Sequence, residues 1–308
     1  MTAFAVTELS DVAAIDWIAV DWGTSNLRVS AIGSNGPLAT RSSDKGMSCL
    51  TRDQFEPALM SLIEDWLPLT RVMPVLACGM VGSRQGWVEA KYRAVPCVPM
   101  DQNGLIRVKT HSERIDVYIT PGLSQTKPAD VMRGEETQIA GALSLYPNFD
   151  GVICLPGTHS KWAHISAGEV VSFQTFMTGE LYALLSGQSV LRHGLTDAGW
   201  DDAAFDSGVD DALSRPEKIA ARLFTLRAEA LLQNLPSASA RARLSGLLIG
   251  IELAAAKPYW LGQSVMLIGA DSLLDTYEKA LVKQGLNPSK LPSQACIIAG
   301  LASVRTPK

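Results

Sequence analysis

The sequence predicts an α/β protein with two domains, each built on a mixed sheet, and a central cleft between them. A strand, a hairpin and two further strands, followed by helix, strand and helix, occur near residue 17 and again near residue 151. Each series has a Gly-Thr pair at its first hairpin, Gly23-Thr24 and Gly157-Thr158. Two matching series with the same polar hairpin predict a duplicated domain.

The elements of the first series follow from local residue patterns. Short apolar runs separated by turn residues predict strands at 17–21, 27–32 and 37–41. Apolar residues at helical spacing predict a helix in 52–67, and a second helix is expected in 134–146. The run 72–80 predicts a buried strand, whereas prolines and a glycine divide 88–120 into short strand-like pieces.

The second series opens at about Gly151. The segment 151–176 predicts three strands with turns at "PGTHS" and "SAGE". Helices are expected in 179–191, 216–232 and 239–256, followed by a strand at 264–269 and helices at 271–285 and 294–304. We place the two domains at 1–145 and 146–308, with the last helix a candidate to cross back to the first domain.

Composition excludes several classes of protein. Of 308 residues, 47% are hydrophobic and 19% charged, and the net charge of −4 gives no basic footprint for nucleic acid. The five cysteines are widely spaced without a CxxC pair, which favours reduced thiols over a zinc site or disulfides. No signal peptide is expected at the N-terminus, and no apolar run approaches 18 residues. We therefore expect a cytoplasmic protein.

The two hairpins have the chemistry of phosphate binding. A glycine at a hairpin tip lets backbone N–H groups approach a ligand, and the hydroxyl groups beside it add neutral donors. The acid at the end of the preceding strand, Asp21, suits Mg²⁺ held directly or through water. Either hairpin alone fits an ordinary tight turn, but two in matching positions predict a clamp on a polyphosphate.

These motifs resemble a known superfamily. "DWGTSNLR" resembles the first phosphate loop of the actin, sugar kinase and heat-shock chaperone ATPases, and "LPGTHSKW" resembles the second. "VMLIGADSLL" occupies the place of the adenosine motif. The resemblance implies a two-domain actin-like ATPase (ribonuclease H-like) fold and binding of ATP with Mg²⁺.

Six segments in order along the chain carry a more specific resemblance. They are "AVDWGTSNLR", "CGMVGSRQGW", "VMRGEETQ", "LPGTHSKW", "FMTGELYALL" and "SGLLIG". Together they resemble the 2-dehydro-3-deoxygalactonokinase family, the sugar-acid kinases of galactonate breakdown. This resemblance implies ATP-dependent phosphorylation of the 6-hydroxyl of 2-keto-3-deoxygalactonate.

The resemblance also implies roles for residues that bind the nucleotide. Asp21 would hold Mg²⁺ on the β- and γ-phosphates. The residues expected at the phosphates are Gly23, Thr24, Ser25, Asn26, Gly157, Thr158 and His159. Those expected at adenosine are Gly250, Gly269, Ala270, Asp271 and Ser272. Gly246 and Gly250 share one helix face and are also expected to allow close helix packing, while Glu252 is a candidate for a ribose hydroxyl or for a buried partner of an arginine.

Glu135 is the predicted acceptor of the hydroxyl proton. It stands in "RGEETQIAGAL", where carbohydrate kinases of the superfamily have an aspartate, and the start of a helix favours an ionised carboxylate there. Glu136 and Asp21 remain rivals. Residues 135 and 136 point about 100° apart on a helix, so normally only one of them faces a ligand.

The sugar acid needs a cation for its carboxylate. Arg84 and Arg133 are the leading candidates, and Arg28 is a third. The glycine-rich loop "GMVGSRQGW" is expected to cover the sugar with Met80, Gly82, Ser83, Arg84 and Trp87, although Trp87 also suits a core position. Glu180 is a candidate for substrate hydroxyls.

Two other functions stay open from the sequence alone. One is another sugar or sugar-acid kinase of the same fold, and the other is an ATP-dependent clamp or sensor without transfer to a small molecule. We expect a sugar acid and ATP as partners, with no nucleic acid and no membrane, and a homo-oligomer is left open.

Overall fold

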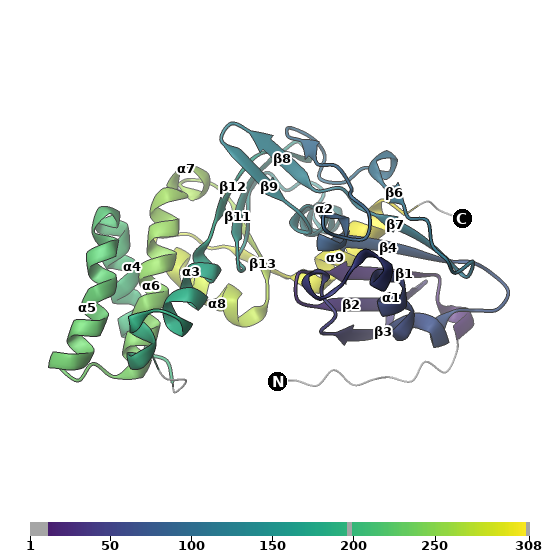
Figure 1. The fold of residues 1–308 in the computed structure, drawn as a ribbon. Helices are drawn as coiled ribbons and strands as arrows, with labels where there is room; N and C mark the ends of the chain where they lie inside the picture. The colour runs from purple at the N-terminus through teal and green to yellow at the C-terminus, as the bar shows by residue number, and fades with distance from the viewer. Residues whose placement is uncertain (1–11, 196–198, 306–308) are drawn as a thin grey trace. The chain divides into compact units, whose positions relative to one another are not determined.

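The computed structural model describes residues 12–195 and 199–305. The chain divides into two compact units (Figure 1). The first unit comprises residues 1–149, 168–170 and 293–308, and the second comprises 150–167 and 171–292.

The first unit is built on a six-stranded mixed sheet in the order β3-β2-β1-β4-β7-β6. Its strands are β1 (Trp17–Trp22), β2 (Leu27–Gly33), β3 (Gly36–Ser43), β4 (Met73–Gly79), β6 (Ile106–Arg107) and β7 (Ile115–Ile119). β1, β2 and β3 pair antiparallel, whereas β4 pairs parallel with both β1 and β7. Five of the six residues of β1 are buried, as expected for a strand that is covered on both faces.

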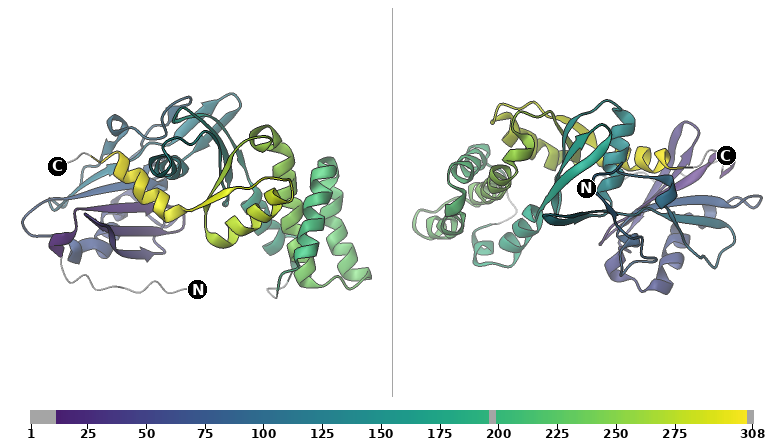
Figure 2. Two further views of the ribbon diagram at one scale, coloured as in Figure 1. Left: turned by 180° about the vertical axis from the view of Figure 1, so that it is seen from behind. Right: turned by 90° about the horizontal axis from the view of Figure 1, so that it is seen from above.

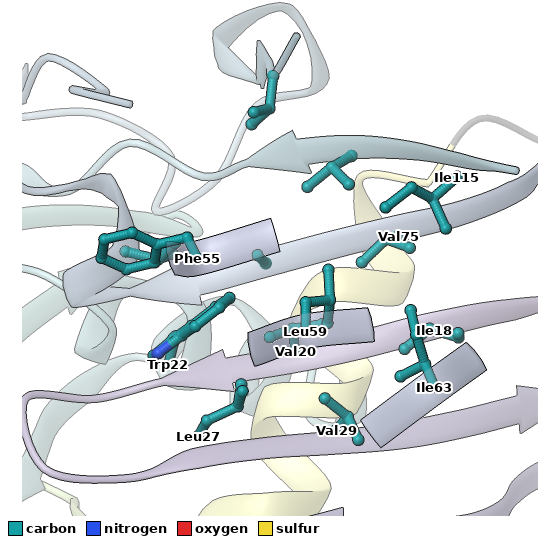
Figure 3. Packing of buried hydrophobic residues seen from close by; sticks show 14 of the residues in the cluster. Ile18, Val20, Trp22, Leu27, Val29, Phe55, Leu59, Ile63, Val75 and Ile115 are labelled. Carbon is teal, nitrogen blue, oxygen red and sulfur yellow. The ribbon is translucent and has the colours of Figure 1, made fainter. Parts of the chain in front are cut away.

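Successive side chains of a strand point to opposite faces, so this sheet has two hydrophobic layers. On one face, α1 (Phe55–Ile63) packs its apolar side chains against alternate residues of β1, β2 and β4 (Figure 3). On the other face, Trp17 and Ala19 join Ala140 of α2 (Glu135–Leu145) and Leu301 of α9 (Ser293–Ser303). α9 is the last helix of the chain and belongs to the first unit (Figure 2).

α2 and α9 approach each other through two glycines. A Cβ at Gly141 would overlap the carbonyl oxygen of Cys296, and one at Gly300 would overlap that of Thr137. Neither overlap can be relieved by a rotamer change, because the obstructing atoms belong to the backbone. The position of α2, which carries Glu135, therefore depends on a helix that lies about 150 residues later in the chain.

Replacing Gly141 by valine is expected to lower the free energy of unfolding by about 3 kcal/mol, because the new side chain must push α9 away from α2. Thermal or urea unfolding measures this change. Gly187→Val is the matched control, since a Cβ at Gly187 meets nothing within 4 Å. Equal losses in the two variants would contradict the packing argument.

The second unit repeats the first sheet in the order β12-β11-β10-β13-β14. Its strands are β10 (Gly151–Leu155), β11 (Ser160–Ser166), β12 (Glu169–Phe176), β13 (Val265–Gly269) and β14 (Ser289–Pro292), and only the first two residues of β12 are counted with the first unit. As in the first unit, the first two strands along the chain, β10 and β11, pair antiparallel. β13 then pairs parallel with β10, as β4 does with β1. The predicted α/β class and the duplicated mixed sheet of the ribonuclease H-like fold are confirmed.

The helices of the second unit are α3 (Thr178–Gly187), α4 (Asp202–Ser214), α5 (Ile219–Leu232), α6 (Ser237–Ala255), α7 (Lys257–Trp260) and α8 (Asp271–Val282). α4, α5 and α6 lie side by side (Figure 1). The sequence pattern does not predict α4, because four aspartates and a glycine obscure the apolar stripe of this helix. A Cβ at Gly246 would overlap Phe205 O, and one at Gly250 would lie 2.8 Å from Val209 O, so these glycines do allow close packing, against α4.

Several shorter elements also differ from the sequence pattern. The expected helix in 52–67 consists of α1 between two 3-10 turns, η3 (Arg52–Gln54) and η4 (Glu64–Trp66). A small sheet of β5 (Arg93–Ala94), β8 (Leu123–Thr126) and β9 (Ala129–Met132) precedes α2. The remaining 3-10 turns are η1 (Val12–Ala14), η2 (Met47–Cys49), η5 (Met80–Gly82), η6 (Gln102–Gly104), η7 (Val190–Gly194) and η8 (Pro216–Lys218). Among the described residues, no helix has both the length and the apolar character needed to span a membrane.

Candidate active site

The first Gly-Thr hairpin joins β1 to β2. Gly23 N–H donates to the carbonyl oxygen of Asn26 over 2.9 Å, which closes the turn. The side chains of Thr24, Ser25 and Asn26 are exposed at the tip. Asp21 pairs with Arg28 across the two strands, with 3.8 Å between Oδ2 and Nη1. The hairpin thus presents small polar groups beside one acid.

A second segment fixes the shape of this hairpin. Met47 N–H donates to Gly23 O over 3.0 Å, and the N–H and Oγ–H of Ser48 both donate to Thr24 O, over 3.0 and 2.8 Å. A Cβ at Gly46 would overlap the backbone of residues 24 and 25, so only glycine permits this approach. The carbonyl oxygens of Gly23 and Thr24 therefore already accept hydrogen bonds from Met47 and Ser48. These bonds hold the hairpin in one shape without a ligand.

Asp21 and Glu135 are electrostatically coupled within the first unit. Burial raises the pKa of Asp21, the Arg28 guanidinium lowers it, and the negative charge of Glu135 raises it again. Gly134, at φ +104°, precedes α2, and a Cβ there would lie 3.4 Å from the Cα of Gly79. Because β4 ends at Gly79 beside β1, the start of α2 and the end of β1 come to the same edge of the sheet.

Glu136 lies beneath this edge and is fully buried. Its Oε2 accepts from Gly134 N–H over 2.6 Å, and its Oε1 accepts from the hydroxyl of Thr137 over 3.0 Å. Burial, reinforced by the charge of Glu135, raises the pKa of Glu136 to about 8. Glu136 therefore supports the turn before α2 from inside, whereas Glu135 is half-buried and accepts from Arg133 N–H over 3.0 Å.

The raised pKa of Glu136 predicts a pH-dependent stability. The folded chain holds this proton up to about pH 8, whereas the unfolded chain releases it near the ordinary value of 4.5. Between these limits unfolding releases a proton, so the free energy of unfolding should fall as pH rises, by up to ~1.4 kcal/mol per pH unit. Thermal unfolding at pH 5 to 9 should show a steeper fall in the wild type than in Glu136→Gln, because the variant loses the contribution of Glu136. An unchanged slope in the variant would contradict the assignment.

A second group of polar atoms lies around Arg133. Its Nη2 donates to Ala90 O over 2.7 Å, and its guanidinium carbon lies 4.3 Å from the centre of the Tyr92 ring. Among the described residues, Nε and Nη1 of Arg133 have no hydrogen-bond partner, nor do the hydroxyls of Ser83 and Thr120. Buried polar groups normally have partners, so these unpartnered atoms of Arg133, Ser83 and Thr120 point to a ligand or to water.

Gly82 brings this group together. A Cβ at Gly82 would lie 2.9 Å from Arg133 Nη1 and 2.8 Å from Cγ2 of Ile119, the residue before Thr120. Gly82 itself precedes Ser83, so residues from η5, from the end of β7 and from the turn before α2 meet here. Met80 is half-buried at the start of η5.

The structure corrects the expected role of Trp87. Its side chain is 9% exposed, and its ring stacks on Phe55 at 6.2 Å between centroids and meets Trp22 edge-on at the same distance. Trp87 is therefore a core residue rather than a surface for a sugar ring. Arg84 of the same loop is exposed, and its carbonyl oxygen accepts from Arg52 Nη2 over 2.9 Å.

The second Gly-Thr hairpin joins β10 to β11 in the second unit, at the position that the first hairpin has in its own sheet. Gly157 is half-buried, and Thr158 and His159 are exposed. The first turn of α3 lies against this hairpin, since a Cβ at Gly179 would overlap the carbonyl oxygen of Gly157. Glu180, the candidate for substrate hydroxyls, lies beside this hairpin, with its Oε2 2.5 Å from Nε2 of His159.

A pocket of about 780 Å³ opens beside this hairpin. The hairpin and the start of α3 form one side of it, through Gly157, Thr158, Thr178 and Gly179. Apart from Ser272, the other lining residues were not predicted from the sequence. They are Tyr182, Gly199, Trp200, Arg241, Ser245, Leu248, Ile249, Leu273, Asp275, Thr276 and Tyr277. The volume and the mixture of apolar walls with a few polar groups suit a nucleotide-sized molecule.

The expected adenosine residues separate in the structure. Ser272 lines the pocket. Gly269 ends β13 beside the hairpin, where its Cβ would lie 3.6 Å from Pro156 O, and Ala270 and Asp271 are exposed at the start of α8. Gly250 is buried against α4 and is not among the residues that line the pocket.

Behind the pocket, Glu252 is buried with three donors. Trp162 Nε1–H donates to it over 2.8 Å, Tyr277 Oη–H donates over 2.8 Å, and the Thr178 hydroxyl donates as well. Burial raises the pKa of Glu252, and these donors oppose that rise. Glu252 is thus bound by three protein donors rather than by an arginine, and it links α6 to β11, α3 and α8.

Comparison with known proteins identifies the family. The family model for 2-keto-3-deoxy-galactonokinase matches residues 21–304, a span that includes both hairpins and Glu135. The chain belongs to this family. The resemblance noted in the six sequence segments is thereby confirmed, and with it the class of enzyme: a kinase, which uses ATP.

Individual relatives cover nearly the whole chain. The 2-dehydro-3-deoxygalactonokinase of Escherichia coli (strain K12) is 34% identical over 94% of this chain and 97% of its own length. A Rhizobium meliloti (strain 1021) protein with the same enzyme name, given provisionally, is 37% identical over 93% of this chain and 95% of its own. A crystal structure from Sinorhizobium meliloti, also provisionally named as this kinase, superimposes with a TM-score of 0.85 at 36% identity, over 94% and 97% of the two chains.

Proposed function

We propose that this kinase transfers the γ-phosphate of ATP to the 6-hydroxyl of 2-dehydro-3-deoxy-D-galactonate, as a step in galactonate breakdown. The observation that carries the proposal is the family match over residues 21–304, to a family named for this substrate. Both curated relatives carry the name of the same enzyme over more than nine-tenths of this chain.

We assign the nucleotide to the pocket of the second unit. The N–H groups and hydroxyl at Gly157 and Thr158 are suited to phosphate oxygens, because glycine leaves the backbone accessible. Trp200 and Leu248 supply apolar walls for the base, and Ser272 supplies a hydroxyl beside them. The exposed hydroxyls and amide of the first hairpin are proposed contacts of the γ-phosphate.

We assign the sugar acid to the first unit, with Arg133 as the partner of its carboxylate. A guanidinium binds a carboxylate with two parallel hydrogen bonds, and two nitrogens of Arg133 have no partner among the described residues. The hydroxyls of Ser83 and Thr120 add donors of the kind that a keto acid can accept. Arg84 is the rival, because its exposed side chain is also able to approach a ligand.

We assign proton acceptance to Glu135. Glu136 is enclosed by the protein, so of the two adjacent acids only Glu135 is accessible. Phosphoryl transfer relies mainly on positioning and charge neutralisation, and a fixed carboxylate needs only to take the hydroxyl proton as the bond to phosphorus forms.

Asp21 suits a magnesium ion that arrives with the nucleotide. No cluster of three or more His, Cys, Asp or Glu ligands occurs among the described residues, but Mg²⁺ commonly uses one or two carboxylates together with phosphates and water. Asp21, half-exposed next to the hairpin, offers such an oxygen ligand. Bound Mg²⁺ would neutralise charge on the β- and γ-phosphates.

The test is ADP release by the purified chain with Mg-ATP and a panel of acceptors. The panel contains 2-keto-3-deoxygalactonate, its gluconate epimer, galactonate, glycerol and glucose. We expect turnover with the keto-deoxy acids only, and a 6-phosphate product by NMR. Turnover with glucose or glycerol instead would favour another sugar kinase, and nucleotide binding without turnover on any acceptor would favour a sensor or clamp.

A further inference from the structure

Glu180 and His159 form a close pair beside the pocket that we assign to the nucleotide. Nε2 of His159 and Oε2 of Glu180 are 2.5 Å apart, although 21 residues separate them in the sequence. Both side chains remain accessible, with 46% of His159 and 37% of Glu180 exposed. The neighbouring residues Thr158 and Gly179 line the pocket itself.

The backbone fixes this pair as well as the side chains do. Glu180 N–H donates to Thr158 O over 2.9 Å, so the residue is tied to the hairpin at two points. Gly179 allows this approach, because a Cβ there would overlap Gly157 O and lie 2.8 Å from the Cα of Thr158. On the other side, Lys161 Nζ donates to His159 O over 3.2 Å. The carboxylate is therefore held in one place relative to the hairpin.

We propose that Glu180 is a positioning residue for the nucleotide, which holds His159 so that its other ring nitrogen, Nδ1, meets a phosphate oxygen. The proposal rests on the assignment of ATP to this pocket under "Proposed function". It replaces the expectation that Glu180 binds hydroxyls of the sugar acid.

The chemistry follows from the two ring nitrogens. A carboxylate on Nε2 fixes the hydrogen at that nitrogen and the orientation of the ring. An imidazole that carries hydrogen on both nitrogens then donates one bond to Glu180 and one to the phosphate. The carboxylate also balances the positive charge of such a ring. Without the imidazole, the same carboxylate would face the phosphates unpaired and repel them.

The repulsion between an unpaired Glu180 and the phosphates predicts the direction in which each variant changes the nucleotide affinity. Isothermal titration of the full chain with a non-hydrolysable ATP analogue and Mg²⁺ should show about tenfold weaker binding in Glu180→Ala. His159→Ala should weaken binding further, because it leaves Glu180 unpaired. Removing Glu180 from the His159→Ala variant should then restore part of the affinity. Glu180→Gln, which retains an acceptor for Nε2, should bind better than Glu180→Ala.

Controls separate this role from a structural one and from a sugar contact. Glu217→Ala, at an exposed carboxylate of the same unit, should leave nucleotide affinity unchanged, and thermal unfolding should show that all variants are folded. In steady-state assays, Glu180→Ala should raise the KM for ATP and leave the KM for the sugar acid within about twofold of wild type.

Two results would overturn the proposal and leave the kinase assignment intact. One is an unchanged nucleotide affinity in Glu180→Ala together with a raised KM for the sugar acid. The other is a double variant in which the two losses multiply, since independent contacts give additive free energies. A wild-type chain that binds no nucleotide would instead overturn the proposed function, and this proposal with it.

Discussion

Replacing Glu135 by glutamine is expected to lower kcat by about 10²–10⁴-fold, the usual contribution of a positioned general base. The amide retains the size of the carboxylate and still accepts a hydrogen bond from Arg133 N–H, but it cannot take the hydroxyl proton. Nucleotide affinity should be unchanged, because the pocket that we assign to ATP lies in the second unit. Single-turnover ADP release measures the step directly.

Controls for this variant come from two other acids. Glu113→Gln, at an exposed site of the same unit, should retain full activity. Asp21→Asn should also lower kcat, but it should change the dependence on magnesium concentration, as Glu135→Gln should not. Turnover near wild type in Glu135→Gln would exclude Glu135 as the base and leave Asp21 as the candidate, since Glu136 is buried.

Replacing Arg133 by methionine is expected to raise the KM for the sugar acid by about 100-fold, because a paired charge and two hydrogen bonds are lost. The KM for ATP should change little. Arg133→Lys should recover only part of the loss, since an ammonium group retains the charge without the two-pronged geometry of a guanidinium. Initial rates over a range of both substrates measure these effects.

The same assay decides between the candidate arginines. Arg84→Met should have the smaller effect on the KM for the sugar acid if Arg133 is the partner of the carboxylate. Arg107→Met is the neutral control, because this exposed arginine lies on the edge strand β6 and pairs with Asp116 of β7. Thermal unfolding must accompany Arg133→Met, since the guanidinium also contacts Ala90 and Tyr92. A larger effect in Arg84→Met would reverse the assignment.

The sequence was informative where a local pattern carries the signal. Strand runs separated by turn residues predicted β1, β2, β10 and β11, and with them the place of both Gly-Thr hairpins. Six ordered segments identified the family, which the match over 21–304 confirms. The sequence was less informative where polar residues interrupt the pattern, as in α4, where four aspartates and Gly208 obscure the apolar stripe.

Roles that depend on contacts between distant residues could not be predicted. Trp87 stands in a glycine-rich loop that suits a sugar site, but Phe55 and Trp22 place it in the core. Glu180 stands in the segment "FMTGELYALL" and was expected at substrate hydroxyls, but in the structure it meets His159 from 21 residues away. In both cases the sequence motif singles out the residue, but only the tertiary structure shows which residues it contacts.

The sequence by itself determined the fold class, the duplication, the family and the two hairpins, because each depends on residues close together in the chain or on their order. The tertiary structure decided which of two adjacent acids is accessible, which residues line the pocket, and which polar atoms around Arg133 lack partners. These features arise when α2 packs on α9 and when α3 meets the second hairpin. Such contacts fix burial and direction, which a linear pattern does not contain.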